Sequence, residues 1–154
     1  MKLSIQMTVN GKEYRLSVDA HKTLLDILRE DLDLTGAKRG CDSGDCGACS
    51  VIMNGKLVNA CLVLAGEADR GNVLSIEGLN NDTKLHPIQQ AFIDHGAIQC
   101  GFCTPGMILA AKALLDVNLE PTDEEARLAI SGNLCRCTGY SKIIEAIRSV
   151  KDYM

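Results

Sequence analysis

The apolar positions in the first half of the chain alternate mainly with polar ones. Four alternating runs occur in two pairs, with an Asn-Gly dipeptide inside each pair: residues 2–9 and 12–18 around Asn10-Gly11, and residues 50–53 and 56–60 around Asn54-Gly55. Asn-Gly between alternating runs predicts a β-hairpin. Leucines at helical spacing predict a helix after Thr23, its expected N-cap, with Asp26 in the capping-box position. With a short strand at 73–77, residues 1–77 predict a small α+β domain.

The second half of the chain shows helical patterns only. We expect four helices, and caps and prolines indicate where they begin. The first two cover residues 86–95 and residues 105–117, the latter capped by Thr104, and the third follows Thr122 with Glu125 in a capping box. The fourth follows Thr138 and has these residues on one face: Tyr140, Ile143, Ile144, Ile147 and Val150. Segment 105–117 is apolar on nearly all sides, which predicts a buried central helix. A polar stretch at 78–83 predicts a linker. The expected domains are therefore 1–77 and 86–154, joined by 78–85.

Composition narrows the class of protein. The 154 residues are 46% hydrophobic and 23% charged, as in a globular protein, and the net charge of −4 argues against nucleic acid or an anionic membrane as a partner. Aromatic residues make up only 3% and Trp is absent, so base stacking is not expected. We find neither an apolar run of about 18 residues nor an export signal, which predicts a cytoplasmic protein.

Eight cysteines are the main chemical feature of the chain. A disulfide scaffold is the simplest alternative, but such scaffolds are typically short, secreted and richer in cysteine. In a reducing cytosol, closely grouped thiols are expected to bind metal.

The first group of cysteines is Cys41, Cys46, Cys49 and Cys61. Its C-x4-C-x2-C spacing with a distant fourth cysteine is the plant-type 2Fe–2S ligand pattern. Gly40, Gly44 and Gly47 would let the loop wrap closely around a cluster and point N–H groups at its sulfurs. A zinc site is the alternative, but zinc sites more often use paired C-x2-C knuckles. We expect Asp42 and Asp45 to be solvated loop residues.

The second group is Cys100 and Cys103, spaced C-x2-C, with Cys135 and Cys137, spaced C-x-C. Each pair precedes a predicted helix, and the positive ends of two helices would favour an anionic thiolate cluster. Spacing alone leaves zinc open at this group.

Three segments together resemble a known family. Residues 40–49 (GCDSGDCGAC), 99–106 (QCGFCTPG) and 132–140 (GNLCRCTGY) are similar to the signatures of the iron–sulfur small subunit of the molybdenum hydroxylases, the xanthine dehydrogenase, aldehyde oxidoreductase and carbon monoxide dehydrogenase family. The resemblance covers essentially the whole chain. It implies an α+β protein in which an N-terminal β-grasp ferredoxin-like domain is followed by an all-α four-helix domain, each with one 2Fe–2S cluster.

The resemblance also implies a role in electron transfer. Electrons would pass from a molybdenum–pterin site through the second group's cluster and then the first group's cluster to FAD. The chain shows no molybdenum or FAD domain, so partner subunits would carry both cofactors and this chain would hold no catalytic residue. Gln99 and Cys137 would lie against the pterin. A helix-terminus hydrogen bond is the alternative for Gln99, and Arg136 is either a partner contact or a solvated or locally paired residue.

Three functions follow from these patterns. The chain is a subunit of a molybdenum hydroxylase complex, a free-standing two-cluster ferredoxin shuttle, or a zinc-stapled structural adaptor. A plant-type shuttle needs no helical cluster domain, which favours the first function over the second. Bound 2Fe–2S centres would make the protein brown, whereas a zinc protein is colourless. The sequence does not name the substrate of such a complex, because the substrate site would lie on another chain.

Overall fold

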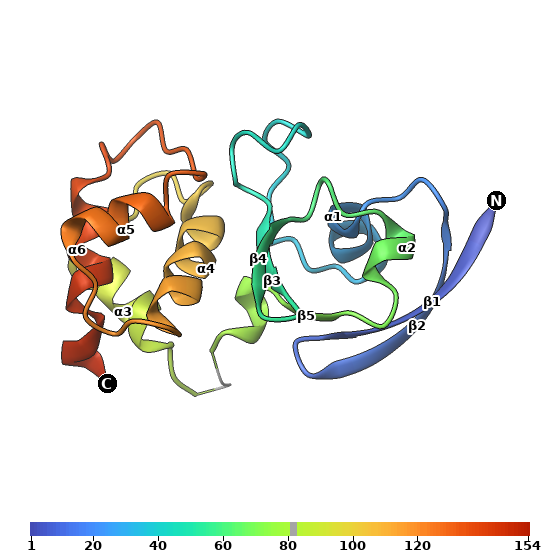
Figure 1. Cartoon of the computed structure of the whole chain (residues 1–154), viewed down its shortest axis with the longest axis horizontal. Coiled ribbons are helices and arrows are strands. Elements are labelled where there is room, and N and C mark those ends of the chain that lie inside the picture. Colours follow the sequence, from blue (N-terminus) through green and yellow to red (C-terminus); the bar gives the residue numbers. More distant parts are fainter. Residues whose placement is uncertain (81–82) are drawn as a thin grey trace.

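A computed structural model describes residues 1–80 and 83–154, and the two residues left out belong to the predicted linker. A five-stranded sheet with short helices fills one end of the molecule and a group of helices fills the other (Figure 1). The strands are β1 (Lys2–Val9), β2 (Lys12–Asp19), β3 (Ser50–Met53), β4 (Lys56–Asn59) and β5 (Asn72–Leu74). They lie in the order β2-β1-β5-β3-β4, with β1 and β5 parallel and the other pairs antiparallel.

Both predicted hairpins are confirmed, and their turns have the expected backbone. Asn10 and Gly11 have φ of 52° and 79°, and Asn54 and Gly55 have φ of 50° and 78°. Two successive residues with positive φ are what a tight two-residue hairpin requires, and Asn-Gly adopts this conformation at little cost.

The predicted helix after Thr23 differs in its second half. Thr23 and Asp26 form the expected capping box, and α1 spans Leu24–Asp26. The chain then continues as a π-helix, η1 (Ile27–Asp31), closed by the bond from Leu32 N to Ile27 O at 3.1 Å. This wider turn accompanies complete burial of four apolar side chains: Leu24, Leu25, Ile27 and Leu28.

Two other details of the first half were not predicted. A short helix, α2 (Ala65–Ala68), covers part of the sheet, and the expected strand at 73–77 ends early at Leu74. The 3-10 helix η2 (Ile76–Gly78) follows β5. Strand β5 ends because the Asn10 side chain forms two hydrogen bonds with Ser75. The Ser75 amide donates to Asn10 Oδ1 at 2.9 Å, and Asn10 Nδ2 donates to Ser75 Oγ at 2.9 Å.

All four predicted helices are present in the second half. They are α3 (Pro87–Asp94), α4 (Thr104–Leu115), α5 (Asp123–Ala129) and α6 (Ser141–Ser149), and the 3-10 helix η3 (Val150–Tyr153) continues α6. The capping box of Thr122 and Glu125 is confirmed. The prediction that Thr104 caps α4 is wrong, because Cys103 is the N-cap and Thr104 is the first helical residue.

Helix α4 is the buried central helix that the sequence predicts. Every residue from Gly106 to Ala111 is buried. One side of α4 packs in the helical core with Phe92 and Ile147, while Leu109 belongs to the core beneath the sheet and α4 lies against β3. This helix therefore connects the two parts of the molecule. No helix in the described residues is long and apolar enough to cross a membrane.

Candidate metal centres

The first group of cysteines meets at the base of the loop that precedes β3. Residues 38–49 of this loop contain no helix or strand, and Cys61 is the second residue after β4. The four thiols of Cys41, Cys46, Cys49 and Cys61 line one small cavity, together with Leu25 and Gly40 among others. Cys49 and Cys61 are buried, Cys46 is half-buried and Cys41 is exposed. The structure thus gathers the four predicted ligands of this group, with one edge of the site open to solvent.

Hydrogen bonding and burial act in opposite directions on these thiols. Hydrogen bonds from Ser43 and Cys46 lower the pKa of Cys41 to about 6, and both backbone amides lie 3.4 Å from its sulfur. Burial and the neighbouring Cys49 thiol raise the pKa of Cys61 to about 11. Cys41 is therefore largely a thiolate at neutral pH, whereas Cys61 needs a nearby positive charge, such as an iron centre, to ionise.

The loop backbone is fitted closely around these thiols. A Cβ atom at Gly40 would lie 2.7 Å from Cys46 Sγ, and one at Gly44 would lie 2.5 Å from Leu62 Cδ1. Asp42 is held by Arg39 at 2.7 Å and Asp45 accepts a hydrogen bond from Ser43, so both acidic residues have partners in the loop. The cavity is therefore lined by four thiols on a loop whose close packing requires glycine, and its donor set fits an iron–sulfur cluster.

The second group lies where α4 and α6 begin. Cys103 is the N-cap of α4, and Cys135 and Cys137 lie in the segment before α6. The thiols lie in two neighbouring pairs, Cys103 with Cys135 and Cys100 with Cys137, and within each pair one thiol raises the pKa of the other. Burial and the Cys135 thiol raise the pKa of Cys103 to about 12. Burial opposes ionisation of Cys135 too, but hydrogen bonds from Thr138 outweigh it and lower the pKa of that thiol.

The grouping of the thiols in pairs bears on the type of metal site. In the described part of the chain, no set of three or more His, Cys, Asp or Glu side chains surrounds one point that could hold a single ion. A structural zinc site needs four ligands around one ion. A 2Fe–2S cluster divides its four thiolates between two irons, two on each. The two sets of four thiols each match the donor set of a 2Fe–2S cluster.

The loops that carry the two groups are hydrogen bonded to each other. The Leu134 amide donates to Cys46 O at 2.8 Å, and Asn133 Nδ2 donates to Gly47 O at 2.9 Å and to Ser50 Oγ at 3.1 Å. Asn133 is only 3% exposed. The loop before β3 and the segment between α5 and α6 run along the same side of the molecule, the upper side of Figure 1. Nothing near Asn133 in the sequence marks this role, since its partners lie more than 80 residues away.

Gly47 provides a test of this close approach. Its φ is +69°, and a Cβ atom there would lie 2.3 Å from Gly132 O and 2.7 Å from Asn133 Nδ2. Gly55 has a similar φ of +78° but no atom within 4 Å of its would-be Cβ. Both substitutions to alanine carry the cost of a left-handed backbone, and only Gly47→Ala adds a clash. We expect the melting temperature of Gly47→Ala to fall about 5 °C further than that of Gly55→Ala; equal losses in calorimetry would contradict the close contact.

The remaining predicted site residues lie at the surface beside the second group. Gln99 is exposed next to Cys100, and within the described residues its side chain makes no hydrogen bond, including none to a helix terminus. Arg136 is also exposed. Two large apolar side chains accompany them, Phe102 with 47% and Leu134 with 56% of its surface exposed. The surface around the second group is therefore apolar and open.

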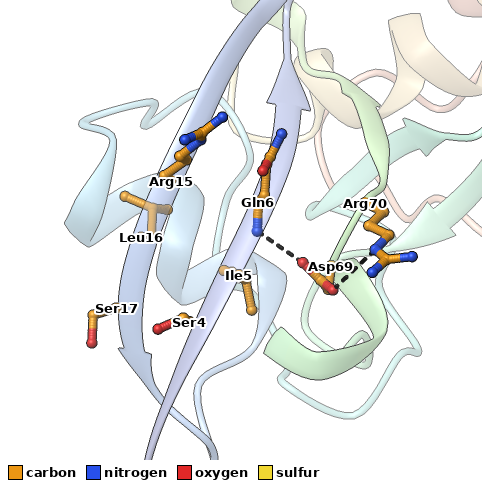
Figure 2. Close-up of a pocket in the computed structure, with 8 residues that line it drawn as sticks. All are labelled: Ser4, Ile5, Gln6, Arg15, Leu16, Ser17, Asp69 and Arg70. Carbon is orange, nitrogen blue, oxygen red and sulfur yellow. Dashed lines mark hydrogen bonds and ion pairs between the residues drawn. The ribbon is translucent and has the colours of Figure 1, made fainter.

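A hollow elsewhere on the molecule has no cysteine in its lining. It has a volume of about 510 Å³ and lies over β1 and β2 beside the end of α2, with Arg15, Asp69 and Arg70 at its edge (Figure 2). Asp69 accepts a hydrogen bond from the Gln6 amide at 2.8 Å. Both arginine side chains are largely exposed. This hollow is separate from the thiol sites.

Comparison with known proteins identifies the family. The model of the 2Fe-2S iron-sulfur cluster binding domain matches residues 7–75, and that of the [2Fe-2S] binding domain matches residues 75–148. The chain is 54% identical to the nicotinate dehydrogenase small FeS subunit of Eubacterium barkeri, over 96% of this chain and 94% of that protein. It is 49% identical to the nicotine 6-hydroxylase small subunit of Paenarthrobacter nicotinovorans, over 95% and 88%.

Solved structures agree with this relationship. A chain of quinoline 2-oxidoreductase from Pseudomonas putida 86 superimposes with a TM-score of 0.94 at 41% identity, over 98% of this chain and 97% of that one. The aldehyde oxidoreductase of Desulfovibrio desulfuricans superimposes with a TM-score of 0.92 at 45% identity, and the match covers 96% of this chain but 17% of that longer one. The chain therefore belongs to the family of two-cluster iron–sulfur subunits of the molybdenum hydroxylases.

Proposed function

We propose that this chain carries electrons through two 2Fe–2S clusters between a molybdenum–pterin subunit and an FAD subunit. The first group, Cys41, Cys46, Cys49 and Cys61, holds the first cluster, and the second group, Cys100, Cys103, Cys135 and Cys137, holds the second. When bound, each cluster accepts and releases one electron. The observation that carries the proposal is that eight thiols gather into two sets of four on loops joined by the hydrogen bond from Leu134 N to Cys46 O.

The thiol pairs indicate which cysteines share an iron. Cys49 neighbours Cys61 closely enough to raise its pKa, and Cys103 with Cys135 and Cys100 with Cys137 form two similar pairs. Two thiolates that share one iron must be neighbours, so each of these pairs would hold one iron, and Cys41 with Cys46 would hold the other iron of the first cluster.

The finer domain organisation is part of the same proposal. Residues 1–77 form a β-grasp ferredoxin-like domain, 78–85 a linker and 86–154 a four-helix domain. Separate family models for residues 7–75 and 75–148 support this division, as do two largely separate hydrophobic cores. Leu109 of α4 packs in the sheet core, so the two domains share a tight contact.

Exposed apolar side chains support the assignment of partners to each cluster. Phe102 and Leu134 surround the second group, where Cys137 and Gln99 are also exposed, and this surface faces the molybdenum–pterin subunit. The surface near the first group exposes Leu62 and Cys41 and faces the FAD subunit. Contact with partners on both sides distinguishes a fixed subunit from a free shuttle.

Metal analysis of the purified chain tests the proposal. Iron and acid-labile sulfide are each expected at about four per chain, because each thiol set holds one two-iron unit. The reduced protein should give two distinguishable paramagnetic signals, since the two sites differ in exposure and hydrogen bonding. Stoichiometric zinc with little iron would refute the cluster assignment. Iron-loaded protein that binds neither a flavoprotein nor a molybdenum subunit would instead favour the shuttle.

A further inference from the structure

Thr138 makes two hydrogen bonds to the sulfur of Cys135. Its backbone N–H lies 3.4 Å from Cys135 Sγ, and its hydroxyl Oγ1 lies 3.1 Å from the same sulfur. Both lie within hydrogen-bond distance for a sulfur acceptor, and bonds of this kind to an ionised acceptor are the strong ones. Cys135 thus receives a side-chain donor as well as a backbone donor from a residue three positions further along.

The direction of the hydroxyl bond is fixed by Tyr140. The Tyr140 backbone N–H donates to Thr138 Oγ1 at 3.2 Å. The Thr138 hydroxyl has one hydrogen. Because its oxygen accepts the bond from Tyr140, this hydrogen is available to donate to another acceptor. Its acceptor is Cys135 Sγ, 3.1 Å away. Thr138 is therefore held as a donor to the sulfur.

The backbone at Tyr140 is unusual and belongs to the same arrangement. Tyr140 has φ of +70°, which is an outlier for a bulky residue, and it follows Gly139 with φ of +67°. Its phenol oxygen accepts the Cys135 backbone N–H at 2.9 Å. The bonds form a closed circuit, from Cys135 N to Tyr140, from Tyr140 N to Thr138, and from Thr138 to Cys135 Sγ. The left-handed backbone at Tyr140 directs its ring toward Cys135 and its amide toward Thr138.

We propose that Thr138 is a positioning residue that raises the reduction potential of the second cluster through its bond to Cys135 Sγ, with Tyr140 holding the hydroxyl in the donating orientation. This inference rests on the proposed function, since it requires a cluster at the second group. Reduction adds one negative charge to the cluster, and part of that charge resides on the ligand sulfurs. A donor at a ligand sulfur stabilises the reduced state more than the oxidised state, so the potential rises.

The test compares three variants of the full-length, iron-loaded chain. Thr138→Val keeps the shape of the side chain but removes the hydroxyl, whereas Thr138→Ser keeps the hydroxyl. Thr104→Val makes the same chemical change one residue after Cys103, at a half-buried threonine with no hydrogen bond to a thiol among the described residues. Potentiometric titration followed by electron paramagnetic resonance reports both clusters in one sample, with the first cluster as an internal reference.

We expect Thr138→Val to shift the reduction equilibrium of the second cluster about tenfold toward the oxidised form, which is 59 mV for one electron. Thr138→Ser and Thr104→Val should leave it unchanged, as should the first cluster in every variant. An unchanged second-cluster potential in iron-replete Thr138→Val would overturn the proposal. So would a loss of iron in Thr138→Val but not in Thr138→Ser, because the hydroxyl would then be needed for assembly of the cluster.

A second measurement works on the unmodified protein. The Fe–S stretching frequencies of the second cluster should shift when the protein is exchanged into heavy water, because the Thr138 hydroxyl proton donated to Cys135 Sγ is exchangeable. Thr138→Ala should remove part of that shift. An identical isotope shift in both proteins would also overturn the proposal. Unmodified protein without iron or sulfide would refute the proposed function itself, and this inference would fail with it.

Discussion

In the assembled complex, Cys49→Ser is expected to stop flavin reduction almost completely while the second cluster is still reduced by substrate. Cys49 is buried at the first group and lines the same cavity as Cys61, so its loss removes half of one iron's thiolate ligands. Iron should fall to about two per chain. Each 2Fe–2S unit carries one electron at a time, so two units in series form a path in which neither can be bypassed. Rapid-freeze spectroscopy and flavin absorbance after mixing with substrate would follow each centre.

Cys103→Ser is the matched variant and blocks the same path one step earlier. Cys103 stands at the start of α4 in the second group, and its loss should leave both the first cluster and the flavin oxidised after substrate is added. The iron content should again be about two per chain, so the two variants lose the same amount of metal, but substrate reduces the remaining cluster only in Cys49→Ser. Normal flavin reduction in Cys49→Ser, or a reduced first cluster in Cys103→Ser, would show that the proposed order of electron flow is wrong.

The parts of the fold that the sequence predicts well depend on local chemistry. Asn10-Gly11 and Asn54-Gly55 specify hairpin turns because the positive φ values they adopt are needed at those two positions and nowhere nearby. The capping box of Thr122 and Glu125 marks the start of α5 for the same reason, since all its bonds lie within four residues. The spacing of the eight cysteines is also local within each motif, which explains why the two sets of thiols were predictable.

The parts that the sequence does not predict depend on distant contacts. Strand β5 ends at Leu74 because Asn10, 65 residues earlier, binds Ser75. The π-helix after Asp26 follows from burial beneath the sheet, which helical periodicity does not report. The joint between the loops of the two thiol groups depends on Asn133, whose acceptors at Gly47 and Ser50 lie 86 and 83 residues away. No pattern along the chain marks any of these contacts.

The loop of residues 38–49 has little structure of its own to keep it ordered. Within it, Cys41, Asp42, Ser43 and Asp45 are exposed, and few backbone bonds hold it, among them Lys38 N to Ala48 O at 3.0 Å and Leu134 N to Cys46 O at 2.8 Å. Strand β3 begins at Ser50, lies between β5 and β4, and buries Val51 completely. Order in the loop must therefore come mainly from metal–thiolate bonds, whereas order in β3 comes from the sheet and its core.

Removal of iron should consequently unfold the loop of residues 38–49 and leave strand β3 folded. After chelation under reducing conditions, we expect amide hydrogen exchange in residues 38–49 to accelerate by about a hundredfold or more, because the free energy of metal binding is coupled to the folding of such segments. Amides of Ser50–Met53 that donate to the neighbouring strands should stay protected, and they serve as the internal control in the same sample. Slow exchange that persists in residues 38–49 without iron would show that the loop is ordered by the protein alone. Equal acceleration in the loop and in β3 would show instead that the cluster supports the whole sheet.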